Sequence, residues 1–192
     1  MTRSKLIAIG GNRTKTDVTL LDNLTAVVAE IESRFGKVTA RSSWYVTPAF
    51  PAGSGPDFLN AALLIKSDLS PSDTLHHLHE IEAKFGRERN KRWGPRTVDL
   101  DLIADGDAIA PDQQTWRTWA DLPVEKQMQD TPDQLILPHP RMQDRSFVLV
   151  PLNEICPDWI HPVLGLTIAQ MHDDLTEEDR KTVVKLPDPA CQ

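Results

Sequence analysis

The order in which strand-like and helix-like apolar patterns follow one another in the first half of the chain constrains the fold more than any other feature. Strand-like runs are short and apolar, whereas helix-like runs repeat apolar residues at three- and four-residue spacing. The patterns predict a strand, a helix, two strands, a helix and a strand at 5–9, 17–35, 38–46, 58–65, 70–85 and 97–104. This β-α-β-β-α-β order is typical of the split βαβ, ferredoxin-like arrangement, an α+β fold with an antiparallel sheet and both helices on one face. We expect the other face to be free to hold a ligand.

The second half of the chain shows no comparable period and forms a C-terminal extension of this arrangement. We interpret residues 1–175 as one domain with an insertion at 107–134, followed by a polar C-terminal tail at 176–192. The insertion contains Trp116 and Trp119, which would share one face of a helical turn. We therefore predict a short amphipathic element that docks its tryptophans on the domain in a structural role.

The charge balance excludes several classes of partner. The 192 residues include 21 basic and 28 acidic ones, a net charge of −7, so we expect no bulk cationic surface for nucleic acid or an anionic membrane. Cys156 and Cys191 form no CxxC pair, which disfavours a disulfide framework and a thiolate zinc site. The apolar run at 6–9 is too short for a signal peptide, and no segment reaches the roughly 18 apolar residues of a membrane span. We expect a cytoplasmic monomer that binds small molecules.

Two carboxylates on the last predicted strand of the domain are the first candidate for chemistry. Asp99 and Asp101 are two residues apart, so both side chains leave the same face of the strand, while Leu100 and Leu102 face the core. Paired carboxylate oxygens are hard ligands that suit Mg²⁺ together with substrate phosphates. For an isolated pair of this kind, a solvated strand face is the simpler interpretation.

The segment before these carboxylates is strongly basic. Within 87–96 it holds five cations and one acid, Glu88, a local charge of +4 in a chain of −7. The cations are Arg87, Arg89, Lys91, Arg92 and Arg96. Arginine forks bind phosphate oxygens, and Trp93 offers a flat surface for stacking. A solvated basic loop is the alternative, but cations beside paired acids indicate a nucleoside triphosphate or diphosphate, held by side chains because no Walker A pattern is present.

Five segments match one family in order and spacing. They read SSWYVTP at 42–48, PDFLNAA at 56–62, GRER at 86–89, RWGPRTVDLDL at 92–102 and PHPR at 138–141, followed by Arg145 and Phe147. With these motifs, the chain from about residue 6 to residue 175 resembles the 6-hydroxymethyl-7,8-dihydropterin pyrophosphokinases of folate synthesis. The pattern RWGPRTxDLDL is highly specific for that family.

The resemblance implies that a pyrophosphoryl group passes from ATP to the hydroxymethyl group of 6-hydroxymethyl-7,8-dihydropterin, with release of AMP. It implies that Asp99 and Asp101 hold two Mg²⁺ ions that bridge the phosphates of ATP. It also implies that Arg87 and Arg96 contact the phosphates and stabilise charge in the transition state.

The same resemblance implies the residues that bind each substrate. For ATP they are Glu82, Arg89, Arg92, Trp93, His139 and Arg145. For the pterin they are Phe58 and Phe147, which would enclose the ring, with Asn60 and the Thr47 backbone at its edge. The chain departs from many members of the family at Gly11 and from some at His79 and Pro140, and its segment 107–134 is longer than the usual connection.

A non-catalytic nucleotide-binding module is the competing hypothesis, because ferredoxin-like sheets also serve as binding and regulatory domains. A catalytically inactive relative is expected to lack one of the two aspartates or Arg96, and all three are present. An RNA-binding platform would need a basic sheet face, which Asp99 and Asp101 contradict.

Overall fold

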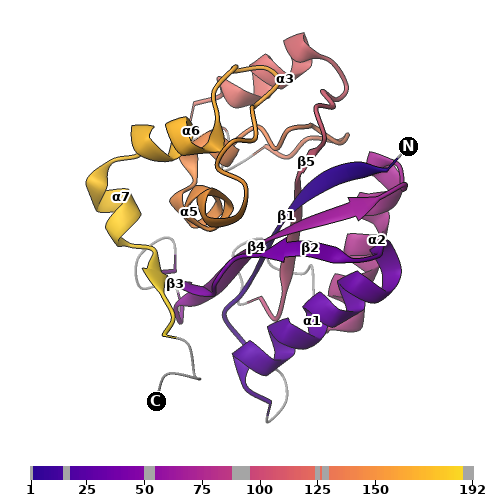
Figure 1. Cartoon of the computed structure of the whole chain (residues 1–192), viewed down its shortest axis with the longest axis vertical. Helices are drawn as coiled ribbons and strands as arrows, with labels where there is room; N and C mark the ends of the chain where they lie inside the picture. The colour runs from indigo at the N-terminus through magenta and orange to yellow at the C-terminus, as the bar shows by residue number, and fades with distance from the viewer. Residues whose placement is uncertain are drawn as a thin grey trace.

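The computed structural model describes residues 2–14, 18–49, 55–87, 96–123, 126 and 130–187. These residues form an antiparallel sheet of six strands in the order β5-β1-β4-β3-β6, with β2 also paired to β4 (Figure 1). The strands are β1 (Arg3–Gly11), β2 (Val38–Arg41), β3 (Tyr45–Thr47), β4 (Phe58–Ser67), β5 (Asp99–Asp105) and β6 (Val184–Lys185). The prediction of an α+β fold with an antiparallel sheet is confirmed.

Two helices pack on one face of the sheet, as the sequence predicts. They are α1 (Leu20–Phe35) and α2 (Pro71–Lys84), and their buried side chains share one core with alternate residues of β1 and β5. Ser70 caps α2, since its hydroxyl accepts a hydrogen bond from the Asp73 backbone at 3.1 Å. The apolar stripes of both helices face the sheet in this core.

The predicted strand at 38–46 is wrong as a single strand, because β2 and β3 are separated by three residues. Ser42 lies in this break and is buried. Its hydroxyl accepts a hydrogen bond from the Ala62 backbone at 2.9 Å, in place of a backbone carbonyl, while the Ser42 N–H still donates to the Ala62 carbonyl at 3.0 Å. The break lets β3 continue along β4 in a new register.

The opposite face of the sheet is not free over its whole length, contrary to expectation. It is covered by α5 (Ser146–Ile155), on which α6 (Ile168–Asp174) packs, across the sheet from α1 and α2 (Figure 1). Leu6, Ala62 and Ala104 present apolar surface on this face, and α5 and α6 bury it in a second core. A ligand site is therefore restricted to the strand ends beyond this core.

The predicted polar tail contributes structure of its own. It forms α7 (Glu177–Lys181) and the strand β6, which pairs with β3. Glu154 of α5 accepts hydrogen bonds from the Tyr45 hydroxyl at 3.0 Å and from Lys185 Nζ at 3.2 Å. These contacts tie β3 between α5 and the C-terminal segment.

The predicted amphipathic element within 107–134 is the helix α3 (Gln113–Ala120). Trp116 is 1% exposed, and its indole N–H donates a hydrogen bond of 2.7 Å to the Pro138 carbonyl. Trp119 is only partly buried, so one of the two predicted tryptophans anchors the helix. A backbone pair between Ala110 and Leu137 fixes the segment to the same place.

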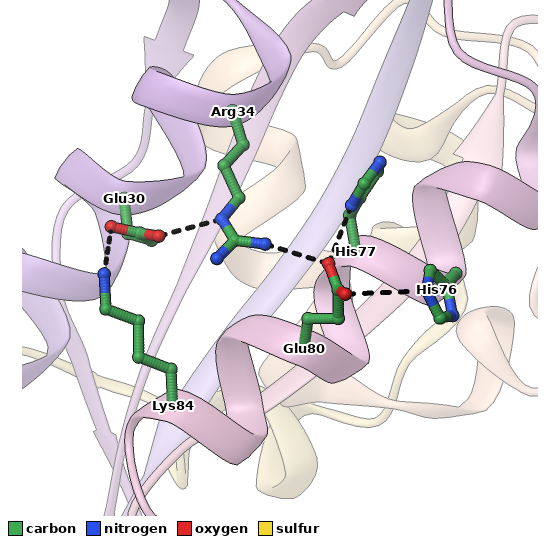
Figure 2. Close-up of polar contacts among 6 residues, drawn as sticks. All are labelled: Glu30, Arg34, His76, His77, Glu80 and Lys84. Atoms are coloured by element: carbon green, nitrogen blue, oxygen red, sulfur yellow. Dashed lines mark hydrogen bonds and ion pairs between the residues drawn. The ribbon is translucent and has the colours of Figure 1, made fainter.

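Polar side chains link the outer surfaces of α1 and α2. Figure 2 shows Glu30 between Arg34 and Lys84, and Glu80 between Arg34, His76 and His77. The partners lower the pKa of Glu30, chiefly through Lys84, and that of Glu80, chiefly through His77. Exposed ion pairs of this kind contribute little stability, so the core holds the two helices together. None of the described helices is long and apolar enough to span a membrane.

Candidate active site

The paired aspartates lie on one face of β5, as the sequence predicts. Leu100 and Leu102 are buried in the core with α1 and α2, whereas the side chains of Asp99 and Asp101 are 21% and 39% exposed. β5 is an edge strand, so the two carboxylates stand at one border of the sheet. They face the side that α5 partly covers.

Strand register places an amide in line with these carboxylates. Asp99 lies opposite Gly10 of β1, and Gly10 lies opposite Asn60 of β4. Residues directly opposite each other share a face of the sheet, so the side chains of Asn60 and Asp99 lie on the same face. Their backbones are about 10 Å apart, which is two strand spacings. A Cβ on Gly10 would lie 2.3 Å from Asn60 Oδ1, so only glycine leaves room for the amide as it stands.

Thr47, Phe58 and Asn60 form a group beside this row. Asn60 is buried, and its Nδ2 donates a hydrogen bond of 2.8 Å to the Thr47 hydroxyl. Thr47 lies opposite Phe58, which places a ring next to the amide on the same face. An aromatic ring and an oriented amide can stack on a flat heterocycle and hydrogen-bond its edge.

Two arginines neutralise Asp99. Arg87 Nη1 lies 2.8 Å from Asp99 Oδ1, and Arg96 forms a second ion pair with the same carboxylate. Burial raises the pKa of Asp99, as does the neighbouring Asp101, while Arg96 and Arg87 oppose the rise. An anion that entered the site could take over both guanidinium groups.

Glu82 lies beneath this pair of arginines. Its side chain is 1% exposed, contacts Arg87, and accepts a hydrogen bond from the Leu100 backbone at 2.8 Å. Burial raises the pKa of Glu82 to about 7, although Arg87 opposes the rise. Glu82 thus joins α2, Arg87 and β5 at the point where the two aspartates begin.

The first turn of α5 borders the site from the other side. Arg145 Nη1 lies 3.9 Å from Asp101 Oδ2, and its guanidinium carbon lies 5.7 Å from the centre of the Phe147 ring. Phe147 is 38% exposed, which is unusual for so large an apolar side chain. The ring is therefore available to a ligand.

His139 is held by its backbone and by one ring nitrogen. Its N–H donates to the Ile103 carbonyl at 2.7 Å, and its Nδ1 accepts from the Arg141 backbone at 3.1 Å. Burial lowers the pKa of His139 well below its usual value, and Arg145 and Arg141 lower it further. The ring is therefore neutral, with its proton on Nε2 as a hydrogen-bond donor.

The structure brings most of the predicted site together. One group gathers at the start of β5: Glu82, Arg87, Arg96, Asp99, Asp101 and Arg145. Arg89, Arg92 and Trp93 lie outside the described residues. Sequence reasoning gave no role to Gly10 or to Asn12, whose backbone and side chain pair with the Arg96 backbone at 2.9 Å. In the sequence these residues are marked by the run Gly10-Gly11-Asn12, which led to no prediction because it matches no phosphate-binding loop.

Comparison with known proteins places the chain among enzymes of one activity. A family described as 7,8-dihydro-6-hydroxymethylpterin-pyrophosphokinase (HPPK) matches residues 6–157. A 2-amino-4-hydroxy-6-hydroxymethyldihydropteridine pyrophosphokinase of Synechocystis is 41% identical over 86% of this chain and 73% of that protein. One of the same name from Methylorubrum extorquens is 38% identical over 65% of this chain, which spans 66% of that protein.

The fold agrees with a solved structure of much lower sequence similarity. Wild-type HPPK-DHPS of Plasmodium falciparum, crystallised with pteroate, matches with a TM-score of 0.64 at 16% identity. The match covers 90% of this chain but only 42% of that longer one. At this identity the likeness concerns the fold alone.

Proposed function

This chain belongs to the 7,8-dihydro-6-hydroxymethylpterin-pyrophosphokinase family, and we propose how its residues transfer a pyrophosphoryl group from ATP to the pterin alcohol in folate synthesis. The hydroxymethyl oxygen forms a bond to the β-phosphorus of ATP, and its proton passes to water. The bond between that phosphorus and the bridging oxygen breaks, and AMP leaves with the electron pair. The β- and γ-phosphoryl groups therefore move together.

The row formed by Asn60, Gly10 and Asp99 is the observation that carries this proposal. It places a group able to recognise a heterocycle and a group able to hold phosphate chemistry on one rigid surface, about 10 Å apart. That span suits a pterin ring at β4 whose hydroxymethyl group points along the row toward β5. Positioning of this kind accounts for much of the rate in phosphoryl transfer.

The chemistry of the carboxylates fits the two Mg²⁺ ions that the family resemblance implies. Asp99 and Asp101 offer oxygen ligands on one face, and no group of three or more His, Cys, Asp or Glu residues able to hold a metal occurs in the described ranges. Mg²⁺ is commonly bound by one or two carboxylates together with waters and substrate phosphates. Two ions held here would supply positive charge against the phosphate oxygens and the attacking hydroxyl.

Arg87 and Arg96 are the proposed catalytic cations. Both now pair with Asp99, and the phosphates of ATP would offer each guanidinium a more highly charged partner. Glu82 is too deeply buried to be an obvious ATP ligand, so we assign it a positioning role through Arg87. Glu82 also holds the Leu100 backbone, which keeps the aspartates and the arginines in one frame.

The proposed nucleotide contacts come from His139 and Arg145. His139 would donate from Nε2 to an oxygen or ring nitrogen of the nucleotide, and Arg145 stands beside Asp101 at the phosphate end. Arg89, Arg92 and Trp93 remain predictions for the same substrate. Phe58 and Phe147 are proposed to stack on the pterin, with Asn60 and Thr47 at its edge.

The strand order supports the finer expectation about the fold. The β5-β1-β4-β3 order, with α1 and α2 on one face, supports a ferredoxin-like fold in which β2 and β3 together form one interrupted strand. We propose that the protein acts as a cytoplasmic monomer.

Product analysis tests the proposed function against the non-catalytic alternative. The protein is incubated with ATP, Mg²⁺ and 6-hydroxymethyl-7,8-dihydropterin, and nucleotides and pterins are separated by chromatography. We expect AMP and a pterin diphosphate in equal amounts. Formation of ADP would contradict pyrophosphoryl transfer, and nucleotide binding without any product would favour the binding module.

A further inference from the structure

Arg141 lies between two residues of the proposed nucleotide site, His139 and Arg145, yet its side chain has no role in the proposed reaction. It follows His139 by two residues and precedes Arg145 by four, at the start of the 3-10 turn η1 (Met142–Asp144). Its backbone N–H donates to His139 Nδ1 at 3.1 Å. The geometry of the turn therefore keeps the Arg141 side chain close to the nucleotide residues.

The guanidinium of Arg141 lacks a partner among the described residues. Its Nε is buried without a hydrogen bond, and none of the described acids forms an ion pair with it. Buried donors are nearly always satisfied, because an unsatisfied one costs free energy. An arginine kept in such a state is expected to serve a ligand.

The charges around Arg141 indicate what that ligand is. Burial lowers the pKa of Arg141, and the neighbouring charge of Arg145 lowers it further, with Asp144 as the opposing acid. Two cations and a neutral His139 therefore share this corner of the molecule. An incoming anion would relieve the repulsion, and the guanidinium fork matches the oxygens of a phosphate.

We propose that Arg141 binds the phosphate of the AMP part of ATP, an inference that rests on the proposed function. Arg145 lies 3.9 Å from Asp101, at the end where the β- and γ-phosphates belong, whereas neither aspartate pairs with Arg141 among the described contacts. We therefore assign Arg141 to the phosphate next to the nucleoside and leave Arg145 to the phosphates nearer Asp101. When the bond to the β-phosphorus breaks, the electron pair stays on the AMP phosphate, where this cation stabilises it.

Calorimetry with three probes tests the assignment in the Arg141→Gln variant. The probes are AMP, adenosine, and α,β-methylene ATP with Mg²⁺. We expect the affinity for AMP and for the ATP analogue to fall about tenfold or more, as for a lost charge-assisted hydrogen bond, while adenosine binding is unchanged. Arg141→Lys keeps the charge but loses the guanidinium fork, so its affinity for AMP should lie between those of the wild type and Arg141→Gln.

A matched control separates this effect from the change in net charge. Arg180→Gln removes one cation from α7, where Arg180 donates to the carbonyls of His172 and Asp173 at 3.1 and 3.0 Å, and should not alter nucleotide binding. Without ligand, Arg141→Gln should melt at or above the wild-type temperature, because a buried unpaired donor is removed. If Arg141 had a merely structural role, the substitution would lower the melting temperature.

The possible results are distinct. An equal loss for adenosine would overturn a phosphate contact, and a loss for the ATP analogue without one for AMP would overturn the choice of phosphate. If the wild type forms AMP from ATP and the pterin while Arg141→Gln binds AMP normally, this inference fails and the proposed function stands. If Arg141 proves essential for AMP binding but the wild type forms no product, the proposed function fails instead.

Discussion

Replacing Gly10 by alanine should damage pterin binding through Asn60. The new Cβ would lie 2.3 Å from Asn60 Oδ1, whereas ordinary van der Waals contact begins at 3.4 Å. The next nearest atoms are at 3.5 and 3.6 Å, so the Asn60 amide is the group that has to move. Its rotation breaks the hydrogen bond of 2.8 Å to the Thr47 hydroxyl.

The cost of this movement can be bounded from the hydrogen bonds involved. Leaving a buried polar partner unsatisfied costs about 1–3 kcal/mol, which sets the expected loss of stability. The same misplaced amide should weaken pterin binding by about 1–3 kcal/mol, or roughly fivefold to 150-fold. Calorimetric titration with the dihydropterin measures this loss, and α,β-methylene ATP should bind to Gly10→Ala as it does to the wild type.

A double-mutant cycle shows whether Asn60 mediates the effect. In an Asn60→Ala background, the added Gly10→Ala change meets no amide and should cost no further pterin affinity. An equal loss in both backgrounds would refute the reasoning, since the effect would then act on the ligand or the backbone directly.

Three further predictions follow from single contacts. Phe147→Ala should weaken pterin binding by about 1–3 kcal/mol, the range for base–aromatic stacking, with little change in the binding of the ATP analogue. Equal losses for both ligands in calorimetry would count against stacking of Phe147 on the pterin. Trp116→Phe should lower the unfolding free energy by about 1–3 kcal/mol because the Pro138 carbonyl loses its hydrogen-bond donor, and it should raise the KM for ATP more than it lowers kcat. Trp119→Phe, at the partly exposed tryptophan, is the control. Equal denaturation midpoints for the two variants would contradict the role of Trp116 in anchoring α3. His161 is fully buried, and burial lowers its pKa to about 4. Because the unfolded chain binds a proton on this residue more readily than the folded chain does, up to about 3 kcal/mol of stability should be lost as pH falls from 6.5 to 4. His161→Asn should reduce this pH dependence in urea titrations, and an unchanged dependence would mean that another group is responsible.

The parts of the fold that were predictable are those encoded by local periodicity. The alternation around Asp99 and Asp101 predicted their common face, and the capping residues of α2 predicted where that helix begins. The core under α1 follows from one apolar stripe. Such features depend on neighbours in sequence, and their physical causes are visible there.

The features that were not predictable depend on contacts between distant segments. The break at Ser42 arises because its hydroxyl reaches the backbone of Ala62, twenty residues away. The covering of the second face by α5 and the pairing of β6 with β3 depend on how the C-terminal half folds back. The role of Gly10 became visible only when strand register placed it between Asn60 and Asp99.

The rate of AMP release by the Asp101→Ala variant tests the central claim most directly, because Asp101 is surface-accessible and its loss should leave the fold intact. With ATP, Mg²⁺ and the dihydropterin, we expect this rate to fall roughly 100-fold or more, the scale for losing electrostatic stabilisation of a transition state. Asp107→Ala, in the turn after β5, removes an equal charge outside the site and should retain the wild-type rate. Release of AMP by Asp101→Ala near the wild-type rate would contradict the assignment of the aspartate pair as the centre of the reaction.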